Sequence, residues 1–262
     1  FAAGRVRSRW PDLPVATIPH LCPSAENVEP ERPEGDPVFG VFGFVTPQKR
    51  LPVIFRAFAR ARRDLPRARL LVVGSAPLGL DPRRVAAAAD LSRDAVEVIG
   101  YADAGRFARL LAGVDVGINL RHPTLGETSG TVVRWLGMGI PVVVSTGGWY
   151  DELPEGAVVR VAPDEAEEES LAAALVRLGS DPELRRRMGD AGRAHARETM
   201  TPRAVADAYL RFLLAPRGRE ALRDRLLESL AAALGDVAPA GARAVTGLPG
   251  RVAAGAREAG IL

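Results

Sequence analysis

The 262-residue sequence has little of several residue types, and each shortage excludes a class of protein. It contains one cysteine, Cys22, which excludes an internal disulfide and a cysteine zinc cluster. No apolar run approaches the roughly 18 residues that cross a bilayer. Aromatic residues make up only 5%, but hydrophobic residues reach 47%, enough apolar surface for a chain to fold. The sequence therefore predicts a globular protein without disulfides or membrane spans.

Lysine is almost absent, because Lys49 is the single lysine among 35 basic residues. Basic and acidic side chains nearly balance at a net charge of +3, so the pI of about 9.6 reflects arginine chemistry and does not indicate a nucleic-acid partner. The content of arginine, alanine, glycine and proline is typical of a GC-rich coding sequence. The chain begins with Phe1 and shows no basic-then-apolar leader, so we interpret it as a fragment or processed form of a cytoplasmic bacterial protein.

Several signatures of nucleotide binding and catalysis are missing. No G-x-G-x-x-G follows the first predicted strand, and no acidic residue closes the second, where Val73-Gly74-Ser75 stands; both absences argue against a nicotinamide dehydrogenase. No G-x-x-x-x-G-K-[ST] occurs, which excludes a P-loop NTPase. The chain also lacks the spacing of a Ser/His/Asp triad or of zinc ligands. We therefore expect neither a metal nor another cofactor.

Short apolar segments alternate with helical patterns from residue 38 onward. This alternation is typical of βαβ units, and six such segments predict an α/β fold with a parallel sheet covered on both faces. Right-handed crossovers favour the doubly wound strand order 3-2-1-4-5-6, followed here by C-terminal helices. The predicted strands are 38–45, 69–74, 96–99, 115–119, 141–145 and 157–161. The predicted helices are 51–65, 82–91, 104–111, 130–138, 171–178, 182–199, 202–214 and 217–234.

The same patterns predict three regions. Residues 1–37 are irregular, with a short strand over 13–18 and a linker rich in proline and glutamate. Residues 38–200 form the sheet domain, and residues 201–262 form a helical segment with a loosely ordered tail. An acidic run at 164–169 is typical of carboxylates at a helix N-terminus, with a metal site as the less favoured alternative.

Topology predicts where a ligand binds. In an open α/β sheet, ligands lie beyond the carboxyl ends of the strands where the strand order reverses, which here is between the first and fourth strands. The loops that follow these strands, 46–50 and 120–130, are the most polar parts of the domain. Lys49 and Arg50 stand beside a helix start, so we expect two cations and free helix amides to hold a phosphate. A solvated basic turn is the alternative.

The second loop ends in Gly126-Glu127-Thr128-Ser129-Gly130-Thr131 and leads into a helix. Thr128 or Ser129 is the expected N-cap, and the small residues allow a ligand to approach the backbone. We expect backbone amides and hydroxyls here to receive a diphosphate or sugar, and Glu127 to accept hydrogen bonds from sugar hydroxyls. An ordinary capped helix is the alternative, and His122 is a weaker candidate for a ligand contact.

Six segments occur in order along the chain: GFVTPQKR (43–50), LVVG (71–74), VEVIGY (96–101), AGVDV (112–116), GETSG (126–130) and GIPVVVS (139–145). This series resembles the C-terminal, donor-binding domain of GT-B glycosyltransferases, specifically glycosyltransferase family 4 (glycosyl transferases group 1). The resemblance covers about residues 38–200. It implies that residues 1–37 are the remnant of an N-terminal acceptor domain with its linker. It also implies that residues 203–234 return toward that domain.

The resemblance also implies roles for individual residues. Lys49 matches the lysine of the family's diphosphate-binding basic pair; the arginine of that pair falls at Phe44, and Arg50 substitutes for it. Glu127 takes the part of the first glutamate in the family's paired-glutamate motif, whereas Arg134 stands where the second would bind ribose. The predicted catalytic residues are Lys49, Arg50 and Glu127. The predicted donor-binding residues are Gly43, Phe44, Gly74, Gly100, Tyr101, Arg121, Thr128, Ser129, Gly130 and Thr131.

By this resemblance the chain is the donor-binding half of a retaining glycosyltransferase. Its expected partners are a nucleoside-diphosphate sugar, a carbohydrate or lipid-linked acceptor and an acceptor domain outside the chain, through which it contacts a membrane peripherally. Alone, the chain is expected to have little or no transferase activity. A non-catalytic nucleotide-sugar-binding module and a GT-B nucleotide-sugar 2-epimerase are the alternatives.

Overall fold

The computed structural model describes residues 1–23, 28–215 and 224. The chain divides into two compact units, residues 1–2 with 19–205 and residues 3–18 with 206–262. Across the described residues, every helix is too short or too polar to cross a bilayer. The helix predicted at 217–234, apart from residue 224, and the predicted tail lie outside the described residues.

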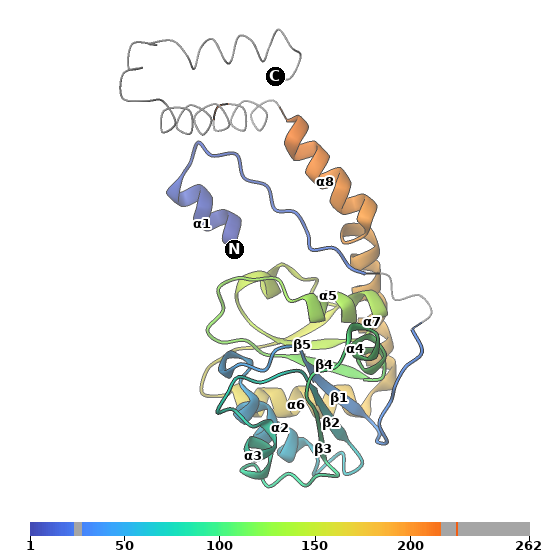
Figure 1. Cartoon of the computed structure of the whole chain (residues 1–262). Helices are drawn as coiled ribbons and strands as arrows, with labels where there is room; N and C mark the ends of the chain where they lie inside the picture. The colour runs from blue at the N-terminus through green and yellow to red at the C-terminus, as the bar shows by residue number, and fades with distance from the viewer. Residues whose placement is uncertain (24–27, 216–223, 225–262) are drawn as a thin grey trace, which may run out of the picture. The chain divides into compact units, whose positions relative to one another are not determined.

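The first unit is built on a six-stranded sheet in which neighbouring strands are all parallel (Figure 1). Its strand order is β3-β2-β1-β4-β5-β6, so the predicted doubly wound sheet and its order are confirmed. The order reverses between β1 and β4, which are hydrogen-bonded neighbours. The strands are β1 (Val38–Phe42), β2 (Arg69–Val73), β3 (Val96–Ile99), β4 (Val116–Asn119), β5 (Val142–Ser145) and β6 (Val158–Val161).

Helices cover both faces of this sheet (Figure 1). Successive side chains of a strand point to opposite faces, so Phe39 and Val41 of β1 enter one core, and Val38 and Phe42 enter the other. The first core is closed by α2, α3 and α6, the second by α4 and α5, and α7 contributes to both. These helices are α2 (Leu51–Ala61), α3 (Pro82–Ala87), α4 (Ala104–Ala112), α5 (Gly130–Met138), α6 (Glu167–Ser180) and α7 (Pro182–Thr199). Helix α8 (Pro202–Leu214) follows α7 in the chain and falls mostly in the second unit.

Several local elements differ from the sequence predictions. The first strand ends at Phe42 because Gly43 has φ +92° and turns the chain out of the sheet. The strand predicted over 13–18 is wrong, since these residues are irregular. Helix α1 (Ala2–Arg9) forms where irregular structure was expected, in keeping with the high helix propensity of alanine and arginine. The short 3₁₀ helices η1 (Pro47–Lys49) and η2 (Gly148–Glu152) were not predicted.

Candidate functional site

A pocket of about 590 Å³ lies at the carboxyl ends of β1 and β4. The loop after β1 and the loop after β4 both contribute to it, and His122 N donates to Gln48 O at 2.9 Å, which joins the two loops directly. Topology predicted a ligand site at this point of the sheet. The pocket is lined by Gly43, Phe44, Thr46, Lys49, Ala102, Ala104, Phe107, Ala108, Arg121, Thr128, Ser129, Gly130, Thr131 and Arg134.

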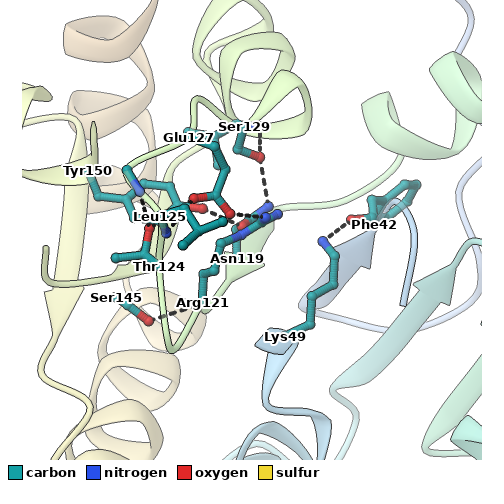
Figure 2. A network of polar contacts seen from close by, with 12 residues as sticks. Phe42, Lys49, Asn119, Arg121, Thr124, Leu125, Glu127, Ser129, Ser145 and Tyr150 are labelled. Atoms are coloured by element: carbon teal, nitrogen blue, oxygen red, sulfur yellow. Dashed lines mark hydrogen bonds and ion pairs between the residues drawn. The ribbon is translucent and has the colours of Figure 1, made fainter. Parts of the chain in front are cut away.

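Lys49 enters the pocket from η1, which begins after Thr46 with Pro47 at its first position. Its side chain is only 5% exposed, and Nζ donates to Phe42 O at 2.6 Å (Figure 2). Burial lowers the pKa of Lys49 from 10.5 to about 8, and the charge of Arg121 adds to the effect. Among the described residues, no carboxylate pairs with this ammonium. A buried cation opposed by a neighbouring cation is stabilised when an anion binds beside it.

The N-terminus of α5 forms the opposite wall. Ser129 is its N-cap, and Ser129 Oγ accepts hydrogen bonds from Val132 N at 3.4 Å and from Asn119 Nδ2 at 3.1 Å. The buried Tyr150 holds this arrangement, because its hydroxyl donates to Asn119 Oδ1 at 2.8 Å (Figure 2). Burial raises the pKa of Tyr150, so the hydroxyl remains a donor at neutral pH.

Gly130 and Thr131 bring the first turn of α5 to the pocket. The first amides of a helix have no partner within the helix, and the helix dipole favours negative charge there. Gly43 keeps the space between this turn and Lys49 open: a Cβ at Gly43 would lie 3.4 Å from Thr131 Oγ1 and 3.6 Å from Lys49 Nζ. An anion in this space would meet the ammonium on one side and helix amides on the other.

Arg121 adds a second cation from the loop after β4. Its backbone amide donates to Ser145 Oγ at 2.9 Å, and its Nη1 pairs with Glu127 (Figure 2). Arg121 Nε is buried and has no hydrogen-bond partner among the described residues. A buried donor without a partner is unfavourable.

Glu127 is held by its neighbours and lies outside the pocket lining. Its carboxylate accepts from Thr124 Oγ1 at 3.1 Å and from Leu125 N at 2.9 Å, in addition to Arg121. Burial acts to raise the pKa of Glu127, but hydrogen bonds from its own backbone amide and from Arg121 bring that pKa below its ordinary value. Glu127 is therefore an ionised group that orients Arg121.

Arg134 adds a third cation, one helical turn into α5, and its Nη1 donates to Gly130 O at 3.0 Å. The lining residues thus carry the charges of Lys49, Arg121 and Arg134 and include no carboxylate. Elsewhere in the described residues, no three His, Cys, Asp or Glu side chains gather as a metal site would require. A pocket of this volume and charge suits a small anionic molecule.

The structure brings eight of the predicted site residues to the pocket and leaves five outside its lining. Those at the pocket are Gly43, Phe44, Lys49, Arg121, Thr128, Ser129, Gly130 and Thr131. The guanidinium of Arg50 bonds to Glu167 instead. Gly74 packs on the backbone, where a Cβ would lie 2.1 Å from Gly43 O. At the end of β3, Gly100 is exposed and Tyr101 is 81% exposed.

The sequence analysis missed one wall of the pocket and the part played by Arg134. Ala104, Phe107 and Ala108 of α4 line that wall. Their i, i+3, i+4 spacing places them on one helix face, which is the signal that could have identified them. Arg134 follows Gly130 by four residues and therefore shares a face with the N-terminal turn of α5.

A second pocket, of about 530 Å³, is lined mainly by apolar residues that include Cys22, Met138 and Met200. Burial raises the pKa of the Cys22 thiol, which donates to Val133 O at 3.4 Å. A protonated, hydrogen-bonded thiol is a poor nucleophile. The pocket at the carboxyl ends of β1 and β4 is therefore the better candidate for a functional site.

Comparisons with known proteins agree with the fold described above. The sequence model of the family described as Glycosyl transferases group 1 matches residues 36–181. A GDP-mannose-dependent monoacylated alpha-(1-6)-phosphatidylinositol monomannoside mannosyltransferase from Corynebacterium glutamicum is 29% identical over 167 residues. That match covers 61% of this chain and 42% of the relative, so the chain spans about two fifths of the relative's length.

Solved structures show the same architecture. The C-terminal domain of a glycosyl transferase group 1 family protein from Francisella tularensis matches with a TM-score of 0.58 at 18% identity, over 69% of this chain and 99% of that domain. An Anabaena protein solved with UDP and glucose matches with a TM-score of 0.58 at 18% identity, over 68% of this chain and 48% of its own. At these identities the likeness shows the fold alone: a GT-B C-terminal domain.

Proposed function

The chain belongs to the family Glycosyl transferases group 1, and from this we propose that it binds the nucleoside-diphosphate sugar donor of a retaining glycosyltransferase. Residues 38–200 would form the donor domain, and the pocket between β1 and β4 would hold the donor. The central observation is Lys49: its buried ammonium has no carboxylate partner among the described residues and faces the N-terminus of a helix.

The diphosphate would lie between Lys49 and the first turn of α5. Lys49 would act as a point charge on one phosphate, the amides of α5 would bind the other, and Arg121 would add its positive charge at the pocket wall. Negative charge grows on the diphosphate as it leaves the sugar. Cations and amides already fixed in place stabilise that charge without reorganising. Arg121 and Arg134 are the second and third cations of this proposal, because the side chain of Arg50 is bonded to Glu167.

The ring of Phe44 would contact the sugar or base. Phe44 lines the pocket and is 59% exposed, so it presents an apolar face beside the cations. The known complex of the Anabaena neighbour with UDP and glucose supports a ligand of this class. The curated relative uses GDP-mannose, which makes GDP and UDP sugars the first donors to test.

We place the acceptor on a domain outside this chain, in keeping with the 42% of the curated relative that the chain spans. Tyr101 and Leu125, which are 81% and 84% exposed, follow β3 and β4 and offer apolar surface to such a domain. Transfer to a carbohydrate or lipid-linked acceptor would then need both domains, and this chain alone would bind donor without transferring it.

Thermal unfolding with UDP, GDP and ADP sugars tests the proposal. A ligand at about 100 times its Kd stabilises the folded state by about 2.7 kcal/mol, and in a domain of this size each kcal/mol raises the Tm by about 2–4 °C. We expect one nucleotide class to raise the Tm of the wild-type chain by about 5–10 °C, and Lys49→Ala to abolish about half of that shift or more. If none of the three classes changes the Tm, the donor-binding proposal fails.

Glu127→Gln is expected to weaken binding of the nucleotide sugar more than binding of the free nucleoside diphosphate. The amide keeps the size of the side chain and one acceptor oxygen, but it loses the charge, and with it the ion pair with Arg121 and the stronger, charge-assisted acceptance from sugar hydroxyls. Titration calorimetry with both ligands measures the two losses. Equal losses would confine Glu127 to orienting Arg121 and would remove the sugar contact.

A further inference from the structure

The turn that carries Lys49 ends at a residue with unusual backbone geometry. Arg50 has φ 58° and ψ 36°, a left-handed conformation that residues other than glycine avoid. Its amide donates to Pro47 O at 3.0 Å and closes η1, and its carbonyl accepts from Ile54 N at 3.1 Å and starts α2. The orientation of η1, which carries Lys49, relative to α2 therefore depends on the conformation of Arg50.

A buried carboxylate on another helix holds the side chain of Arg50. Glu167, in the first turn of α6, is 2% exposed, and its two oxygens lie 3.1 and 2.8 Å from Arg50 Nε. Arg50 Nη2 bonds to the same carboxylate. A guanidinium forked onto a carboxylate fixes orientation as well as position. Because Glu167 is buried, a movement of Arg50 away from it would leave a buried carboxylate without a compensating charge.

The neighbouring acidic residues are more exposed. Glu168 pairs with Arg56 of α2 at 2.6 Å, and their side chains are 29% and 51% exposed. Glu169 is 76% exposed and lies 3.9 Å from Arg60. Carboxylates at a helix N-terminus explain these residues, but they do not explain why one member of the run is buried against the residue that follows Lys49.

We propose that Glu167 is a positioning residue for the phosphate-binding lysine. Through its ion pair with Arg50 it holds the left-handed turn and so sets the place of Lys49 in the pocket. Glu167 acts only through Arg50 and touches no ligand. The effect on donor binding rests on the proposed function, whereas the position of Lys49 is a property of the chain itself.

The single lysine of the sequence allows a direct test. The 262-residue chain labelled with ¹³C-lysine gives one side-chain signal, that of Lys49, whose pH midpoint reports its burial. Glu167→Gln keeps the shape of the side chain and removes its charge. We expect this variant to shift the signal and to raise its pH midpoint from about 8 toward 10.5. We also expect it to weaken nucleoside diphosphate binding about three- to tenfold. This is less than the ten- to hundredfold loss of affinity expected when a whole hydrogen bond to a charged group is removed. Glu168→Gln, the matched control on the same helix turn, should leave the signal, midpoint and affinity unchanged.

Arg50→Gly separates positioning from a general effect on stability. Glycine adopts φ 58° without an ion pair, so Arg50→Gly combined with Glu167→Gln should restore the wild-type signal, midpoint and affinity. An unchanged signal and midpoint in Glu167→Gln would overturn the proposal, as would a double variant that restores neither. If Glu167→Gln does not fold, the double variant decides: a folded protein with the wild-type midpoint supports positioning, and an unfolded one contradicts it. If the wild type binds no nucleoside diphosphate, the proposed function fails, and the lysine signal still tests the position of Lys49.

Discussion

Lys49→Met is expected to give a protein that is more stable than the wild type and binds nucleoside diphosphate about ten- to a hundredfold more weakly. Methionine fills a similar volume without a charge, so the loss of binding is that of one hydrogen bond to a charged group, about 1.5–3 kcal/mol. The gain in stability follows from the burial of the Lys49 ammonium, which belongs to a residue that is 5% exposed and is opposed by the charge of Arg121.

The lowered pKa gives the size and the sign of that gain. A pKa near 8 in the folded state against 10.5 in the unfolded state corresponds to a penalty of about 3 kcal/mol for the charged form. The penalty is fully present below pH 8, is mostly lost as pH rises to 10.5, and disappears above 10.5, where the lysine is neutral in both states. Leaving Phe42 O without its donor offsets about 1–2 kcal/mol, so we expect a net gain of about 1–2 kcal/mol at pH 7.

Denaturant unfolding at pH 7 and pH 10.5, together with titration calorimetry, measures both effects. The stability difference between Lys49→Met and the wild type should shrink between pH 8 and 10.5. A variant that is less stable at pH 7 and binds as tightly as the wild type would contradict the description of Lys49 as a buried, ligand-facing cation.

Gly74→Ala is expected to lower the free energy of unfolding by about 3 kcal/mol or more. Its Cβ would lie 2.1 Å from Gly43 O, and φ of +142° is strained for any residue with a Cβ. Strained backbone and overpacking each contribute about 1–3 kcal/mol. Because Gly43 borders the space beside Lys49, the clash should also weaken donor binding.

Gly100→Ala is the matched control, at a second predicted donor-binding glycine. No atom lies within 4 Å of its added Cβ, and substitutions at such surface sites usually change stability by no more than about 0.5 kcal/mol. Denaturant unfolding of the two variants measures the contrast. If both variants lower the free energy of unfolding equally, the close packing of Gly74 on Gly43 is not the reason that position 74 requires glycine.

The strands of this fold and their order could be predicted from the periodicity of apolar residues and from the rules of sheet topology. Apolar runs of strand length, each followed by a helical pattern, were enough to predict six parallel strands in their order, because few right-handed arrangements satisfy that pattern. The reversal point then predicted that the loops carrying Lys49 and Ser129 meet, and both residues line one pocket. These inferences depend on backbone connectivity, which single side chains hardly alter.

Side-chain partners were harder to predict, because they depend on distances that a sequence does not contain. Arg50 stands next to Lys49 and was expected beside the same phosphate, but its left-handed backbone turns it toward Glu167 on α6. Arg121 was expected to bind donor, but its pairing with Glu127 was not foreseen. Residues 2–9 carried no apolar period, so their helix was missed.

The pH midpoint of Lys49, measured with and without ligand, tests most directly whether this lysine receives the diphosphate. In ¹³C-lysine-labelled protein the single side-chain signal should titrate near pH 8 when the pocket is free. A saturating nucleoside diphosphate should raise the midpoint by about one to two pH units, the equivalent of a charged hydrogen bond, and binding should therefore weaken as pH rises above 8. A midpoint that stays near 8 while the ligand is bound would contradict the account.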